Sequence, residues 1–160
     1  MIVIDISKEG THIEAPSHFV ETGDTIDKFA IGRFMGPVTV VTLPRGPITG
    51  EIVENYFPRN KERVILRTKP DNVFFGGAAE DVAELGYSLL GYDKETLCSN
   101  GDTICYRDLL ASSMVLLEDA DLENVEHDGD YYLIALPVKC DDGDSAPCRA
   151  ILMEQEKGLV

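Results

Sequence analysis

The sequence predicts an α/β domain built on a mixed sheet. Several short apolar segments rich in valine and isoleucine are interrupted by only a few segments with helical patterning. The segment 63–68 (RVILRT) has a continuous apolar centre, which favours a sheet covered on both faces. A chain of 160 residues, with 44% hydrophobic and 27% charged residues, suits one core of ordinary size. No repeat or linker divides it, so we expect a single domain over residues 1–160.

The strand predictions follow from short apolar runs, most of them with β-branched residues, and the runs at 37–43 and 63–68 are closed by proline-containing turns. Pro137 lies inside the run 131–139 and indicates an edge or a bulge there. Residues 89–92 are either the end of a helix or a short strand. The expected strands are 2–6, 37–43, 63–68, 114–117, 131–139 and 148–153.

Three helices are expected between these strands. The first is capped by Thr49 and ends before Pro58. The second begins at Ala79, has acidic residues in its first turn and continues to about Leu90. The third starts after Asp102 and runs through Leu110, and Ile104, Leu109 and Leu110 are expected to face inward.

The composition excludes some classes of partner. A formal net charge of −15 repels a phosphate backbone, so we expect no nucleic-acid partner. No apolar run is long enough to span a bilayer, and residues 1–6 are too short for a signal peptide. We therefore expect a cytoplasmic protein with no membrane partner.

The four cysteines, at positions 98, 105, 140 and 148, form no CxxC pair. Without a secretory signal, free buried thiols are the expected state, with a redox role as the alternative. Their spacing does not suit a zinc knuckle.

The richest chemistry lies in residues 8–19 (KEGTHIEAPSHF). In an extended segment His12 and Glu14 project to the same face. Pro16 restricts the backbone after them, so that His18 can approach the same place from a bend. Two imidazoles beside a carboxylate suit a metal ion or a general base, whereas a polar surface loop is the plainer alternative.

Several motifs in this order resemble one family. Residues 10–18 (GTHIEAPSH) resemble the pattern His-x-Gly-Thr-His-x-Asp-x-Pro-x-His of the cyclase family, which contains bacterial kynurenine formamidases and isatin hydrolases. The resemblance continues along most of the chain, and it implies the family's swivelling β/β/α three-layer fold. Its further motifs are residues 34–41 (FMGPVTVV), 91–93 (GYD), 133–139 (LIALPVK) and 146–150 (APCRA).

The resemblance also implies roles for single residues. His12 and Glu118 match metal-binding positions, Glu14 stands where the family has Asp, and His18 matches the acid/base. The implied ion is zinc or manganese. Lys8 and Tyr106, however, stand where the family has two further histidine ligands.

These departures weaken the implied metal site. His12, Glu14 and Glu118 supply at most three ligands, so we expect a single and weaker ion, or none. We hypothesise that the Lys8 ammonium lies between Glu14 and Glu118 and neutralises them as a buried ion pair. The motif also begins close to the start of the sequence, so we expect the family's front segment to be lost or reduced to residues 1–6.

Three functions remain open. The first is a metal-assisted hydrolase of an amide or lactam bond, of the arylformamidase type, acting on a small-molecule substrate. The second is a non-catalytic member that serves as a small-molecule binding or oligomerising module. The third is a metal-free enzyme in which His18 is the base and Lys8 or Tyr106 stabilises an oxyanion. The resemblance also implies a homo-oligomer, a dimer or a tetramer.

Three other residues are candidates for the pocket. Thr11 belongs to the retained motif. Asp93 either lines the pocket or caps the next turn. Arg149 either organises the site through a carboxylate pair or forms a surface or interface salt bridge.

Overall fold

The computed structural model describes residues 1–154 and contains a sheet of eight strands beside three α-helices. The helices are α1 (Gly50–Tyr56), α2 (Ala78–Glu84) and α3 (Thr103–Leu110), and short 3-10 helices cover Pro16–His18, Ile26–Lys28 and Ile31–Arg33. The strands are β1 (Val3–Asp5), β2 (His12–Glu14), β3 (Met35–Thr42), β4 (Arg63–Arg67), β5 (Leu89–Tyr92), β6 (Val115–Glu118), β7 (Gly129–Pro137) and β8 (Ser145–Glu154).

The sheet is mixed, as the sequence predicts. Its order is β1-β8-β2-β6-β5-β4-β3-β7, and a further pairing of β8 with β7 closes it on itself. Strands β3 to β6 pair in parallel, whereas the pairings of β1, β2, β7 and β8 are antiparallel. The short β2 is inserted between β6 and β8, which joins the parallel half to the antiparallel half.

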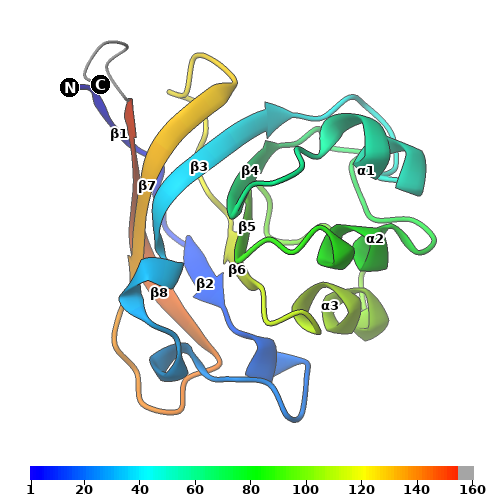
Figure 1. The fold of residues 1–160 in the computed structure, drawn as a ribbon, viewed down its shortest axis with the longest axis horizontal. Coiled ribbons are helices and arrows are strands. Elements are labelled where there is room, and N and C mark those ends of the chain that lie inside the picture. The colour runs from blue at the N-terminus through cyan, green and yellow to red at the C-terminus, as the bar shows by residue number, and fades with distance from the viewer. Residues whose placement is uncertain (155–160) are drawn as a thin grey trace.

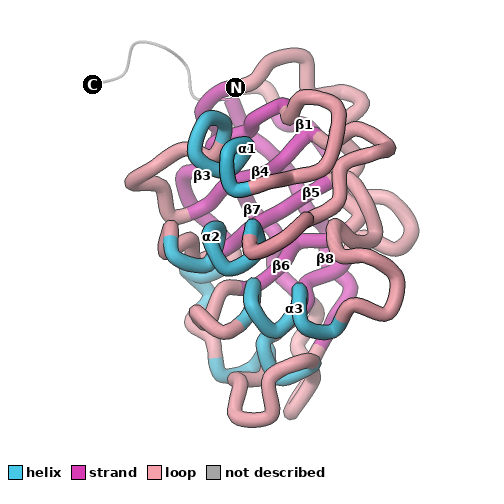
Figure 2. The backbone as a smooth tube through the Cα atoms, turned by 90° about the vertical axis from the view of Figure 1, so that its right-hand side faces the viewer, coloured by secondary structure: helices cyan, strands magenta, loops and turns pink. Residues whose placement is uncertain are grey.

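The elements form three layers, two of strands and one of helices (Figure 1). The helices lie together on one side of the parallel strands, as the turned view shows (Figure 2). Two apolar cores separate the layers: one lies between the two halves of the sheet and the other lies beneath the helices. In β4, Ile65 faces the first core, whereas Val64 and Leu66 face the second. This explains the continuous apolar run of that strand and confirms the expected β/β/α arrangement.

The two predicted helix caps are confirmed. The side chain of Thr49 accepts a hydrogen bond from the Ile52 amide, and that of Asp102 accepts one from the Cys105 amide. The inward orientation of Ile104 is wrong, because 65% of this residue is exposed. Cys105 is buried instead, at the next position of the helix.

The second helix is shorter than predicted. It ends at Glu84, and Gly86 then adopts a φ of +76°, which favours glycine and turns the chain away from the helix. Residues 89–92 form strand β5, so the strand alternative is confirmed.

Pro137 lies at the last position of β7. It pairs with Cys148 of β8, whereas the pairing of β7 with β3 ends at Ile134. The missing N–H of Pro137 therefore lies where β7 is locally an edge, as the sequence indicates.

The prediction of free, buried thiols is confirmed for Cys148 and wrong for the other three cysteines, of which Cys140 is exposed. Cys98 and Cys105 form a disulfide, with their Cα atoms 5.8 Å apart, whereas Cys140 and Cys148 are free. The turn between Cys98 and the start of α3 folds the two cysteines against each other in the helix-side core. Within residues 1–154, no helix has the length and apolarity that a membrane span requires.

Candidate metal centre

Strand β2 places two of the candidate ligands on one face of the sheet. Its middle residue, Ile13, points into the core between the sheet halves, so His12 and Glu14 point to the opposite, helix-side face. His12 lies directly opposite Glu118 in the register of β2 with β6. Glu118 points the same way, because its neighbour Leu117 faces the same core as Ile13. The alternation of two strands thus brings the three side chains together.

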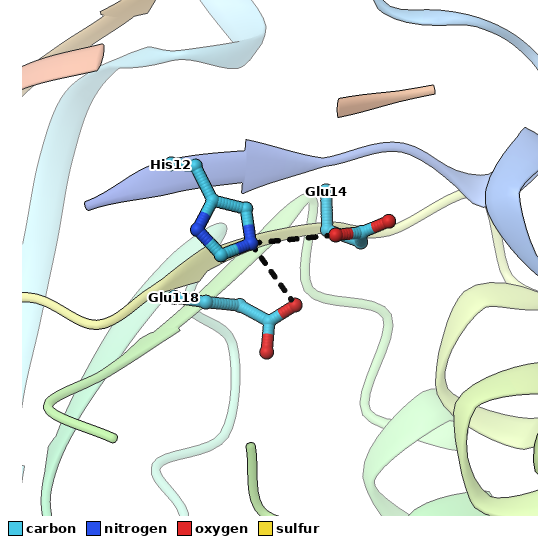
Figure 3. A group of neighbouring side chains, drawn as sticks. All are labelled: His12, Glu14 and Glu118. Atoms are coloured by element: carbon cyan, nitrogen blue, oxygen red, sulfur yellow. Dashed lines mark ion pairs between the residues drawn. The ribbon is translucent and has the colours of Figure 1, made fainter. Parts of the chain in front are cut away.

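The three side chains converge on one point (Figure 3). His12 Nε2 lies 3.4 Å from Glu14 Oε2 and 3.7 Å from Glu118 Oε1. One ligand atom from each residue can be chosen such that all lie within 4.8 Å of one another. The interpretation of residues 8–19 as a plain surface loop therefore does not hold for His12 and Glu14.

The histidine ring is oriented by the backbone. Its Nδ1 lies 2.7 Å from the carbonyl oxygen of Gly10, so Nδ1 carries the hydrogen and donates it there. Gly10 itself has a φ of +100°, and a Cβ at this position would lie 2.8 Å from Asp119 Oδ2. Only glycine fits this turn, and the turn aims Nε2 at the two carboxylates.

The electrostatics of the group favour a positive charge at its centre. Glu14 and Glu118 are 5% and 2% exposed, so their charges are poorly hydrated. The carboxylates of Glu118 and Glu14, in that order of effect, raise the pKa of His12 to about 10. In the absence of a metal ion the histidine would carry the compensating charge.

The donor set fits one divalent ion. One imidazole nitrogen and two carboxylates are ligands that zinc and manganese both accept, and three protein ligands leave a position for water or substrate. The hydrogen bond from His12 Nδ1 to a backbone carbonyl is typical of metal-ligating histidines.

His18 lies at the border of this group. Pro16 begins a 3-10 turn that carries His18 back over β2, where its Nδ1 forms a hydrogen bond with Glu14 Oε1. The ring stacks on Phe19, with centroids 4.5 Å apart, and 44% of the side chain is exposed. Glu14 thus contacts both histidines, one through each oxygen. With Nδ1 committed to Glu14, Nε2 is the ring atom available for proton transfer.

Two tyrosines approach Glu118 from the helix side. The hydroxyl of Tyr92, on β5, donates to Glu118 Oε2 at 2.9 Å, and that of Tyr106, on α3, lies 3.3 Å from the same oxygen. Burial, reinforced by the charge of Glu118, raises the pKa of both phenols above the usual value. Both are therefore neutral donors at physiological pH.

The hypothesis that Lys8 lies between Glu14 and Glu118 is wrong. The Lys8 ammonium pairs with Asp119 Oδ1 at 3.0 Å, and this contact raises the pKa of Lys8. Thr11 holds the same two segments together, because its hydroxyl donates to the Asp119 carbonyl at 2.7 Å and accepts from the Lys8 amide at 2.9 Å. Lys8 and Thr11 therefore tie the start of β2 to the chain that follows β6.

Asp93 and Arg149 have structural contacts outside the group. Asp93 Oδ1 accepts hydrogen bonds from the amide and the hydroxyl of Thr68, which ties together the chain beyond β4 and β5. Arg149 forms a surface ion pair with Asp5 at 2.6 Å, across β1 and β8. The surface salt bridge expected as one alternative for Arg149 is thus observed, whereas Asp93 binds the chain after β4 and not the turn that follows it.

Sequence reasoning did not identify Tyr92 or Phe19 as site residues. Tyr92 lies between Gly91 and Asp93, at the end of a buried strand where an aliphatic residue would pack equally well. Its polar hydroxyl at a buried position was the available signal. Phe19 is stacked between His18 and Tyr106, an arrangement that depends on contacts across the fold.

The sequence matches known proteins along most of its length. The family model described as "Putative cyclase" matches residues 4–96. A kynurenine formamidase of Bacillus cereus is 31% identical over 156 residues, which cover 89% of this chain and 74% of the relative. A kynurenine formamidase of Salinibacter ruber is 31% identical over 160 residues, which cover 91% of this chain and 75% of the relative.

Solved structures show the same fold. A potential metal-dependent hydrolase with cyclase activity superposes with a TM-score of 0.81 at 24% identity, covering 92% of this chain and 79% of its own. Isatin hydrolase A of Labrenzia aggregata superposes with a TM-score of 0.71 at 17% identity, covering 94% of this chain and 82% of its own.

Proposed function

This chain belongs to the cyclase family, and from that membership we propose that it is a metal-dependent hydrolase of an amide or lactam C–N bond, with His18 as its acid/base. The observation that carries the proposal is the convergence of His12, Glu14 and Glu118 within 4.8 Å, with both carboxylates buried. Buried carboxylates without a cation are costly, and a divalent ion offsets that cost.

The ion would be held by His12 Nε2, Glu14 Oε2 and Glu118 Oε1. A zinc or manganese ion there supplies a Lewis acid that polarises the scissile carbonyl and lowers the pKa of water. The two oxygens of Glu14 then have different roles. Oε1 orients the ring of His18 through a hydrogen bond, whereas Oε2 faces His12 and the ion.

His18 moves the proton in this scheme. Its Nε2 takes a proton from the attacking water, whose oxygen bonds to the carbonyl carbon. The same atom then gives that proton to the nitrogen as the C–N bond breaks. His18 can be reached from solvent, because 44% of its side chain is exposed.

The substrate class comes from the relatives. The curated relatives are kynurenine formamidases, and isatin hydrolases are among the structural neighbours. We therefore propose an arylformamide as the first substrate to test and a cyclic aryl amide as the second. Association into a homo-oligomer stays a prediction.

The position of Lys8 counts against the metal-free alternatives. They assign charge compensation to Lys8 and oxyanion stabilisation to Lys8 or Tyr106, and Lys8 is paired with Asp119 instead. Tyr106 does contact Glu118, so its hydroxyl is directed to that carboxylate and to Thr96 and not to a substrate oxyanion.

The proposal is tested by hydrolysis assays on protein stripped of metal by a chelator and then dialysed. We expect N-formylkynurenine or isatin to be hydrolysed after zinc or manganese is restored, and not before. His12→Ala should abolish the recovery, whereas His127→Ala, at a histidine whose side chain is 79% exposed, should preserve it. A failure of both ions to support hydrolysis of either substrate would overturn the proposal.

A further inference from the structure

The two oxygens of Glu118 have different surroundings. Oε1 faces His12 Nε2 at 3.7 Å, on the side of the proposed ion. Oε2 points away from it and receives the hydroxyls of Tyr92 at 2.9 Å and Tyr106 at 3.3 Å. Each carboxylate oxygen accepts about two hydrogen bonds, and at Oε2 both places are taken by phenols, of which Tyr92 is the nearer.

Tyr92 is held rigidly for this contact. It is 0% exposed and sits at the end of β5, within the helix-side core. The register pairs Gly91 with Leu117, so Tyr92 lies beside Glu118 on the neighbouring strand. A buried phenol needs a partner for its hydroxyl, and Glu118 is the partner that the structure gives it. A phenylalanine would pack in the same space, so the specific contribution of the Tyr92 hydroxyl is its hydrogen bond to the Glu118 carboxylate.

Tyr106 belongs to a short chain of hydrogen bonds. Its hydroxyl lies 2.5 Å from Thr96 Oγ1, and the amide of Cys98 donates to Thr96 Oγ1 at 3.0 Å. Tyr106 has one hydrogen to donate. It is directed to Thr96 Oγ1 and, at the longer distance of 3.3 Å, to Glu118 Oε2, so Tyr106 is the weaker of the two phenol donors to Glu118. Stacking on Phe19, with centroids 4.2 Å apart, fixes the ring from the other side.

We infer that Tyr92 and Tyr106 are positioning residues that occupy Oε2 of Glu118 with hydrogen bonds. Oε1 is then the only oxygen of Glu118 that can bind a metal ion, and the centre is limited to a single ion. This inference rests on the proposed function. A second cation at Oε2 would have to displace a phenol whose ring the core or the stack holds in place. Hydrogen bonds to the outer oxygen of a metal-binding carboxylate also fix its rotation, which strengthens binding at the inner oxygen.

The test measures metal binding itself, by titration calorimetry and by plasma mass spectrometry, on metal-free protein with zinc and with manganese. We expect one ion per chain in the wild type. Tyr92→Phe should keep one ion but weaken its affinity about 10–100-fold, the usual effect of losing an outer-sphere partner. Tyr106→Phe, which loses the longer contact, should weaken it less.

Tyr87→Phe is the matched control. Tyr87 is 2% exposed and its hydroxyl donates to the Pro58 carbonyl at 2.5 Å, away from the site. Its loss should destabilise the metal-free fold as Tyr92→Phe does, but leave metal affinity unchanged. The visible absorption of the cobalt-loaded protein should likewise shift in Tyr92→Phe and not in Tyr87→Phe.

A double variant tests the limit on the number of ions. Tyr92→Phe with Tyr106→His removes both hydroxyls and adds an imidazole beside Oε2, and more than one ion per chain is expected. Two ions in the wild type, an unchanged affinity in Tyr92→Phe or a single ion in the double variant would each overturn the inference and leave the proposed function standing. A wild type that binds no ion would overturn both.

Discussion

His12 and Glu118 lie directly opposite each other on the antiparallel strands β2 and β6, with His12 Nε2 3.7 Å from Glu118 Oε1. Residues far apart in the sequence meet here because a three-residue strand is inserted beside the last parallel strand. The site therefore depends on the register of β2, since a shift of one residue would turn both His12 and Glu14 into the core.

Replacement of His18 should separate catalysis from metal binding. His18→Asn removes the proton carrier while Glu14 and His12 keep their places, so kcat should fall about 10²–10⁴-fold. Metal content should remain that of the wild type. His127→Asn, at an exposed histidine, is the control and should leave kcat unchanged. An equal loss of metal in His18→Asn would mean that His18 is a ligand and not the acid/base.

The metal-free protein should lose stability at alkaline pH. The pKa of His12 is raised from 6.5 to about 10 by Glu118 and Glu14. The stabilising charge is therefore fully present below about pH 6.5 and is lost as the pH rises through about 10. The measurement is the free energy of unfolding in the presence of a chelator, compared between wild type and His12→Gln. The difference between the two should shrink as the pH rises, and a difference that is independent of pH would contradict the assignment.

Reduction of the Cys98–Cys105 disulfide should destabilise the fold. The bond closes a short loop and so restricts the unfolded chain, an effect of about 2–3 kcal/mol for a loop of this length. Urea unfolding with and without reductant measures it, and Cys98→Ala with Cys105→Ala should match the reduced wild type. Cys140→Ser, at an exposed free cysteine, is the control. Unfolding that does not respond to reductant would show that the bond does not form in solution.

The parts of the fold predicted from sequence are those encoded locally. The apolar run of β4 and the caps at Thr49 and Asp102 depend on neighbouring residues alone, and all three are confirmed. The sequence predicts a longer helix α2 than the structure contains, because the apolar residues of β5 follow it closely and only the turn at Gly86 separates them.

In the candidate site, too, the locally encoded features are predictable from the sequence and those that depend on contacts across the fold are not. His12, Glu14 and His18 lie within one short motif, so their meeting follows from strand alternation and the turn at Pro16. The partner of Lys8 does not follow from the motif, because Asp119 reaches it from the chain beyond β6. The Cys98–Cys105 disulfide does not follow from the sequence pattern, because the pairing depends on how the turn before α3 folds.

The central claim is that His12, Glu14 and Glu118 bind a metal ion. The direct measurement is the metal content, by plasma mass spectrometry, of protein purified without a metal-affinity tag. We predict close to one zinc or manganese per chain in the wild type and in His127→Ala, and almost none in His12→Ala. A wild type that holds no metal, even after incubation with excess zinc or manganese, would contradict the account.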